Sequence, residues 1–141
     1  LERMRIRFGN VALDKHGSVR AILRGLQQGA RNGLLIDQRV REDQGIEVPF
    51  FGHPAWTHPI LARVARKTGA PVVPTFAICE QPGRYSLRYE APVLVEELPA
   101  AEREDLPLTA RFMAILESAI RERPEQWLWY HDRWKQLRVG G

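Results

Sequence analysis

The sequence contains little cysteine and no long apolar run. Cys79 is the only cysteine among 141 residues, which excludes a disulfide framework. It lies in an apolar, strand-like run, so we interpret it as a buried structural thiol. No apolar run approaches the roughly 20 residues that span a bilayer, so the sequence predicts no transmembrane helix.

Motifs for several kinds of chemistry are also absent from the sequence. It has no Gly-x-Ser-x-Gly elbow, and Ser18, Ser86 and Ser118 all have structural explanations. It has no glycine-rich phosphate loop. His53 and His58 are five residues apart, unlike the four of a helical zinc pair, and no cysteine or third histidine accompanies them. We therefore expect neither a metal site nor a cofactor.

The composition is that of a folded protein with a basic surface. Hydrophobic residues make up 44% of the chain and charged residues 27%, as in globular proteins. The length fits one domain, and we predict a single domain over residues 1–141. The net charge of +4, carried mainly by arginine, favours phosphate groups, lipid headgroups, acidic carrier proteins or nucleic acid as partners. Because the basic residues are scattered, the charge does not choose among these partners.

Apolar periodicity predicts helices and strands in alternation. We expect helices at residues 1–8, 18–28, 57–68 (with Thr57 as N-cap), 108–123 and 125–135, and strands at residues 11–13, 34–36, 71–78 and 85–89. This order indicates an α/β fold, a mixed-sheet sandwich with flanking helices. Residues 1–7 read as the end of a helix, so we expect the chain to be the carboxyl-terminal portion of a longer domain.

One stretch has the layout of a strand-end site. The apolar run at residues 34–36 ends in Asp37 and Gln38, and a polar loop then leads to an apolar Val-Pro-Phe-Phe-Gly segment at residues 48–52. Functional groups of α/β proteins often lie just past the carboxyl end of a buried strand. The stretch is either such a site or a strand with a polar end.

Several motifs in a fixed order resemble one protein family. They are Asp37-Gln38; the segment at 48–52 with Ala55 and Thr57; Thr-Gly-Ala-Pro-Val-Val-Pro at 68–74; and Pro-Glu-Gln-Trp-Leu-Trp at 124–129 with His131, Arg133, Trp134 and Lys135. The set is similar to the lauroyl/myristoyl-type lipid A biosynthesis acyltransferases of Gram-negative bacteria, within the glycerolipid acyltransferase superfamily. The resemblance covers nearly the whole chain, and the block at 124–129 is its most specific part.

The resemblance implies an enzyme at the cytoplasmic face of the bacterial inner membrane. Such an enzyme moves a fatty acyl chain from acyl carrier protein or acyl-CoA to a hydroxyl of a lipid A precursor or related phospholipid. The family's general base belongs to a His-x-x-x-x-Asp/Glu motif. The residues five positions after His16, His53, His58 and His131 are Ala21, His58, Arg63 and Gln136, so no histidine here fits. Since the family carries that motif upstream of the matched segments, we expect these 141 residues alone to be inactive.

The resemblance also implies roles for individual polar residues. Arg5 and Arg7 match a basic pair that would hold a phosphate of the lipid or donor, although a solvated helix face explains them equally well. Asp37 and Gln38 match a supporting block, in which Asp37 orients the catalytic histidine or a basic ligand-binding residue. The alternative for Asp37 is a cap on the following loop. Arg39 stands where many members carry a second acid, which argues against a paired-carboxylate or metal site.

The remaining candidates are apolar or lie in aromatic segments. Phe50, Phe51, Gly52 and Trp56 would line an acyl-chain slot, or they belong simply to the core, and Thr57 is a further candidate for contact with the substrate. The aromatic residues Trp127, Trp129, Tyr130 and Trp134 suit either a membrane interface or a cap on the core. A non-catalytic α/β module that binds a phospholipid headgroup or nucleic acid is the alternative function, and the resemblance favours a lipid over nucleic acid.

Overall fold

The computed structural model describes residues 6, 9–13 and 17–134, which belong to two compact units, Leu1–Gly33 and Leu34–Gly141. In the first unit, helix α2 (Ser18–Gln27) follows Gly17 and buries Ile22, which confirms the helix predicted there. Residues 11–13 were expected to form a strand. They are irregular instead, and Val11 is 80% exposed. A strand needs a partner for its backbone groups, and no described segment pairs with these residues.

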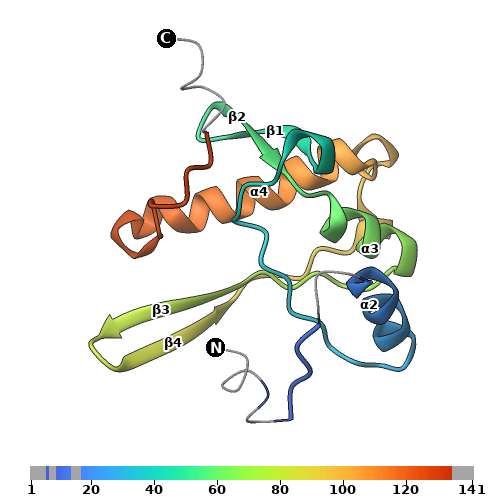
Figure 1. Cartoon of the computed structure of the whole chain (residues 1–141), viewed down its shortest axis with the longest axis horizontal. Coiled ribbons are helices and arrows are strands. Elements are labelled where there is room, and N and C mark those ends of the chain that lie inside the picture. The colour runs from blue at the N-terminus through green and yellow to red at the C-terminus, as the bar shows by residue number, and fades with distance from the viewer. Residues whose placement is uncertain (1–5, 7–8, 14–16, 135–141) are drawn as a thin grey trace. The chain divides into compact units, whose positions relative to one another are not determined.

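The second unit contains strands, helices and short 3₁₀ turns (Figure 1). Their order is η1 (Glu42–Gln44), β1 (Ile46–Phe50), β2 (His53–Thr57), α3 (Ile60–Thr68), β3 (Thr75–Gln81), β4 (Arg84–Tyr89), η2 (Val95–Glu97), η3 (Ala100–Glu102), α4 (Asp105–Glu122) and η4 (Pro124–Gln126). Strand β4 and helix α4 confirm the predicted strand at 85–89 and helix at 108–123. None of the described helices is long and apolar enough to cross a membrane.

The strands form two antiparallel ribbons. In the first, β1 pairs with β2 from Ile46–Thr57 to Phe50–His53; in the second, β3 pairs with β4 from Thr75–Tyr89 to Gln81–Arg84. Each ribbon turns through two residues, and a link that short joins only antiparallel strands. The predicted α/β class is therefore confirmed, with two separate ribbons in the described residues where one mixed sheet was expected.

The strand expected at residues 34–36 is not formed. The segment is irregular, and Leu35 is 79% exposed while Ile36 packs against the core. Similarly, the strand expected at 71–78 begins only at Thr75, because Pro74 has no N–H to donate and Val72 makes just an isolated bridge to Val93. A continuous apolar run predicts burial, but it does not supply a neighbouring strand.

The predicted start of the third helix was also wrong. Thr57 is the last residue of β2, where it pairs with Ile46, so it does not cap a helix. Helix α3 begins at Ile60, whose backbone N–H donates to Nδ1 of His58 at 3.1 Å. The side chain of His58 thus accepts from a free amide of the first turn, where Thr57 was expected as the cap.

The carboxyl-terminal helical piece expected at 125–135 is replaced, in its described part, by the single turn η4 and irregular structure. Pro124 starts a short 3₁₀ turn, and the backbone is extended again at Trp127. The indoles of Trp127 and Trp134 pack against the core from this irregular path. Tertiary packing of these large rings has overridden the helical pattern.

Helix α4 joins two hydrophobic clusters. The first contains Ala62, Ala65, Val93, Val95, Leu108 and Phe112, and the second contains Val48, Phe50, Ala55, Met113 and Ile120. The first lies toward α3, and the second toward the β1–β2 ribbon, beside which α4 runs in Figure 1. The second cluster carries the candidate site.

Candidate functional site

The β1–β2 turn is built from Phe51 and Gly52, with φ of +50° and +77°. Two-residue turns with positive φ at both positions usually hold Asn-Gly, because a Cβ is strained there. Phe51 is the only residue other than glycine with positive φ among those the structure describes. Such strain persists only where the surroundings fix it.

Glu117 and Arg121 of α4 fix this turn. The Phe51 N–H donates to the Glu117 carboxylate at 2.6 Å, and Arg121 donates to the same carboxylate at 2.7 Å. The Arg121 guanidinium also lies over the Phe51 ring, 4.8 Å from its centroid. Burial acts to raise the pKa of Glu117, but the two donors outweigh it, so the pKa is lowered and the carboxylate stays ionised.

Residues far apart in sequence meet in an aromatic cluster, defined as Phe50, Phe51, Trp127, Trp129 and Trp134. Phe50 stacks on Trp134 with centroids 5.7 Å apart and meets Trp127 edge-on at 5.7 Å. Phe51 lies 5.7 Å from Trp129, which contacts Trp127 at 4.7 Å. The structure therefore brings the Phe-Phe-Gly segment and the Pro-Glu-Gln-Trp-Leu-Trp block into one site.

Exposure divides the carboxyl-terminal aromatics between the two interpretations. Trp127 and Trp134 are partly buried against the second cluster, so they cap the core. In contrast, Leu128, Trp129 and Tyr130 are 58%, 48% and 92% exposed. Three consecutive large apolar side chains are therefore open to a ligand or a surface.

Arg133 is the central polar residue of the site. Its side chain is fully buried, and it donates to Thr57 Oγ1 at 2.8 Å and to the Trp56 carbonyl at 3.3 Å. The guanidinium lies 5.5 Å from the centroid of the Phe50 ring. Thr57, predicted to bind substrate, is itself buried and accepts from Arg133.

Asp37 is electrostatically linked to Arg133. Burial lowers the pKa of Arg133 to about 10, while the negative charge of Asp37 acts to raise it and Arg39 to lower it. Arg133 is therefore still a cation at neutral pH. Asp37 is half-buried, and Gln38 beside it is exposed. Arg133 was not among the predicted site residues, although it lies four residues after the most specific motif block, at 124–129.

The loop that follows Asp37 is held against β2. Val40 N–H donates to the Trp56 carbonyl at 3.3 Å, the same oxygen that accepts from Arg133. A Cβ on Gly45 would lie 2.6 Å from a Val40 methyl and 3.1 Å from the Thr57 carbonyl, so only glycine fits there. The Asp37 loop, strand β2 and the carboxyl-terminal segment therefore meet at the Trp56 carbonyl.

The structure gathers most of the predicted residues. Asp37, Phe50, Phe51, Gly52 and Thr57 all lie around the aromatic cluster and Arg133. Arg5 and Arg7 lie outside the described residues. No group of three or more histidine, cysteine or acidic side chains that could hold a metal occurs in the part of the chain that is described.

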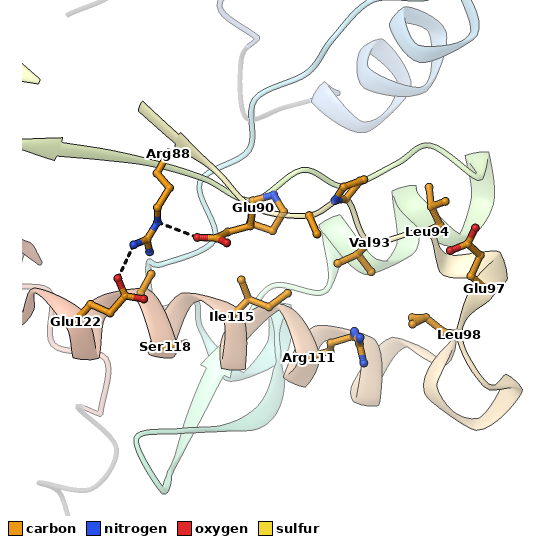
Figure 2. Close-up of a pocket in the computed structure, with 14 residues that line it drawn as sticks. Arg88, Glu90, Val93, Leu94, Glu97, Leu98, Arg111, Ile115, Ser118 and Glu122 are labelled. Atoms are coloured by element: carbon orange, nitrogen blue, oxygen red, sulfur yellow. Dashed lines mark hydrogen bonds and ion pairs between the residues drawn. The ribbon is translucent and has the colours of Figure 1, made fainter. Parts of the chain in front are cut away.

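A cavity of about 500 Å³ lies between α4 and the segment that follows β4 (Figure 2). Its lining includes none of the predicted residues. Figure 2 shows Arg88 paired with both Glu90 and Glu122. The Arg88–Glu90 pair is 2.8 Å long, and Arg111 pairs at 2.9 Å with Glu102, which is not drawn there. Because carboxylates already neutralise both arginines, the cavity lacks the free cation that a phosphate needs.

Comparison with known proteins identifies the family. A search of curated proteins finds no match to the chain. The family model described as bacterial lipid A biosynthesis acyltransferase matches residues 1–136. The match includes Asp37, the aromatic cluster and Arg133, and it confirms the resemblance found in the sequence. The chain therefore belongs to the bacterial lipid A biosynthesis acyltransferase family.

Proposed function

We propose that this chain is part of an enzyme that transfers a fatty acyl chain from acyl carrier protein or coenzyme A to a hydroxyl of a lipid A precursor or related lipid, at the cytoplasmic face of the bacterial inner membrane. Membership of the family supports the reaction class. The observation that carries the proposal is the aromatic cluster, which forms an apolar wall beside the Asp37 loop.

Exposure assigns different tasks within this wall. The rings of Phe51 and Trp129 are only partly covered, so an acyl chain can lie against them. Phe50 is fully buried, and its ring packs edge-on against that of Phe51, with centroids 4.8 Å apart. Binding pockets for such ligands are mostly apolar with few polar groups, which fits this surface.

The proposed chemistry is direct transfer without a covalent enzyme intermediate. The acceptor hydroxyl attacks the thioester carbonyl as a general base removes its proton, and the thiolate leaves when the tetrahedral intermediate collapses. Backbone N–H groups or a basic side chain stabilise the oxyanion. The base would come from a His-x-x-x-x-Asp/Glu motif outside this sequence, and Asp37 would act as a supporting charge.

The test is Asp37→Ala in the acyltransferase of which this chain is part. We expect acyl transfer to a lipid A precursor to fall by about 10- to 100-fold, since a slight misplacement of catalytic groups has effects of that size. Asp43→Ala is the matched control, because Asp43 lies in the same loop and pairs with the exposed Arg41. Unchanged transfer by a folded Asp37→Ala protein would exclude the role of Asp37.

Separate assays distinguish the two acyl donors and test nucleic acid as an alternative partner. Transfer is measured with acyl carrier protein and with coenzyme A thioesters of the same chain. Absence of transfer by the unmodified protein, together with salt-sensitive binding to nucleic acid, would instead support the non-catalytic anion-binding module.

A further inference from the structure

We infer that Arg133 is a positioning residue that fastens the carboxyl-terminal segment to strand β2 and thereby fixes the place of the Asp37 loop. Its effect on catalysis rests on the proposed function, whereas its effect on the loop does not. The inference starts from a fully buried cation whose hydrogen bonds go to uncharged oxygens.

Stability alone does not account for an arginine at this place. Removing a guanidinium from water is costly, and an apolar side chain of similar size often serves a core at least as well. Among its described contacts, Arg133 has no hydrogen bond to a carboxylate, and its Nε has no partner. Asp37 acts on it through charge and not through a hydrogen bond. We therefore attribute the presence of arginine here to the fixed geometry of its planar guanidinium, which orients two hydrogen bonds at once.

The fork joins the carboxyl-terminal segment directly to β2 and, through a shared carbonyl, indirectly to the Asp37 loop. One Nη donates to Thr57 Oγ1 at 2.8 Å and the other to the Trp56 carbonyl at 3.3 Å, so Arg133 grips the end of β2. The Trp56 carbonyl also accepts from Val40, three residues after Asp37. The backbone bond of Val40 therefore ties the loop that carries Asp37 to the same carbonyl that Arg133 binds, and the charge of Asp37 favours the cationic form of Arg133.

A lysine cannot reproduce this arrangement. Its single ammonium is a point charge without the planar geometry that reaches both oxygens. Arg133→Lys keeps the charge that attracts Asp37 but loses the fork, and Arg133→Met loses both. Thr57→Val removes one acceptor and leaves Arg133 in place. The three variants separate charge from geometry, and Arg111→Met on the opposite face of α4 is the control.

The first measurement is amide hydrogen exchange in the 141-residue chain. We expect Arg133→Lys, Arg133→Met and Thr57→Val to speed exchange at Val40 by about tenfold, the effect of losing one hydrogen bond to a charged group. Exchange at Met113 in the core of α4 should change far less, and Arg111→Met should change neither. Equal acceleration at Val40 and Met113 would reduce Arg133 to a general stabiliser and overturn the inference. If Arg133→Met fails to fold, the lysine and valine variants decide the outcome.

The second measurement is steady-state kinetics in the longer acyltransferase. Arg133→Lys should lower kcat by about tenfold or more, with less change in KM for the lipid acceptor, because misplacement affects the transition state more than binding. A normal kcat with accelerated exchange at Val40 would show that the loop position does not matter for the reaction. If the unmodified enzyme transfers no acyl chain, the proposed function fails, and hydrogen exchange still decides whether Arg133 positions the loop.

Discussion

At the scale of single residues, the β1–β2 turn shows where function and local preference diverge. Phe51 occupies a backbone conformation that suits asparagine or glycine, and Glu117 and Arg121 hold it there. A turn selected only for folding would carry Asn-Gly. The strained phenylalanine places an aromatic ring beside Trp129, which supports its assignment to the proposed acyl wall.

Gly52→Ala tests the strain of this turn. The φ of Gly52 is +77°, and an added Cβ would meet nothing within 4 Å, so the penalty is purely conformational. We expect the free energy of unfolding to fall by about 1 kcal/mol, measured by urea titration. Gly33→Ala is the control, since its φ is not in the left-handed region and space is open. An equal loss for both glycines would contradict the strain argument.

Glu117→Gln tests the carboxylate that holds the turn. Because its folded-state pKa is lowered, Glu117 stabilises the fold above its unfolded pKa, near the ordinary value of 4.5, and this contribution is lost as the pH falls. The variant should be less stable at pH 7 and should lose less stability between pH 7 and pH 3 than the unmodified chain. Parallel profiles of stability against pH would show that Glu117 is not the group responsible.

At the scale of elements, α4 and the η4 turn that follows it each hold one of the two ribbons. Glu117 fastens the β1–β2 turn, while the side-chain amide of Gln126 in η4 pairs with the β3 edge. The backbone N–H of Cys79 donates to Oε1 of Gln126 at 2.9 Å, and Nε2 of Gln126 donates to the backbone carbonyl of Cys79 at 3.0 Å. This amide takes the place of a neighbouring strand at an otherwise open edge.

Gln126→Ala removes this clamp. A two-stranded ribbon is only marginally stable by itself, so we expect the Cys79 amide to exchange faster by about fivefold, the effect of roughly 1 kcal/mol. Amides in the centre of α4 should keep their protection. Glu125→Ala beside it is the control, because Glu125 is an exposed residue of the same turn. Unaltered exchange at Cys79 would show that the ribbon holds without the clamp.

At the scale of the whole molecule, net charge and exposed apolar side chains point to a lipid surface. The chain carries a charge of +4, and Leu128, Trp129 and Tyr130 project consecutively from it. Aromatic side chains with a polar edge favour the membrane interface, and basic proteins are attracted to anionic headgroups. Both contributions depend on conditions that an experiment can vary.

Vesicle sedimentation tests this expectation. We expect the chain to bind phosphatidylcholine vesicles that contain phosphatidylglycerol more tightly than phosphatidylcholine alone, with the difference shrinking as salt is raised. A double variant, Trp129→Ala with Tyr130→Ala, should bind less at every salt concentration. Tyr85→Ala is the control, since Tyr85 is 67% exposed but lies on the β3–β4 ribbon. Equal binding by all three proteins would exclude the Leu128–Tyr130 surface.

The sequence predicted those features that depend on local pattern. The apolar spacing of α4 and the alternation in β4 identified both elements, because periodicity reports which face is buried. The motif order identified the family that the residue 1–136 match confirms. The apolar pattern gave wrong predictions at residues 34–36 and 125–135, where the expected strand and helix are absent from the described structure. An apolar run favours burial whether it is a strand, a helix or irregular, and contacts with neighbouring segments decide which of these it becomes.

The sequence by itself determined the α/β class, the family and the candidate stretch that contains Asp37 and Phe51. Only the tertiary structure showed that Arg133 enters the site from a segment about a hundred residues beyond Asp37 and meets β2 there. Side-chain contacts between distant segments leave no periodic trace in sequence, because they depend on where the chain folds back. For the same reason, burial separated the core tryptophans from the exposed one, although all stand in the same motif block.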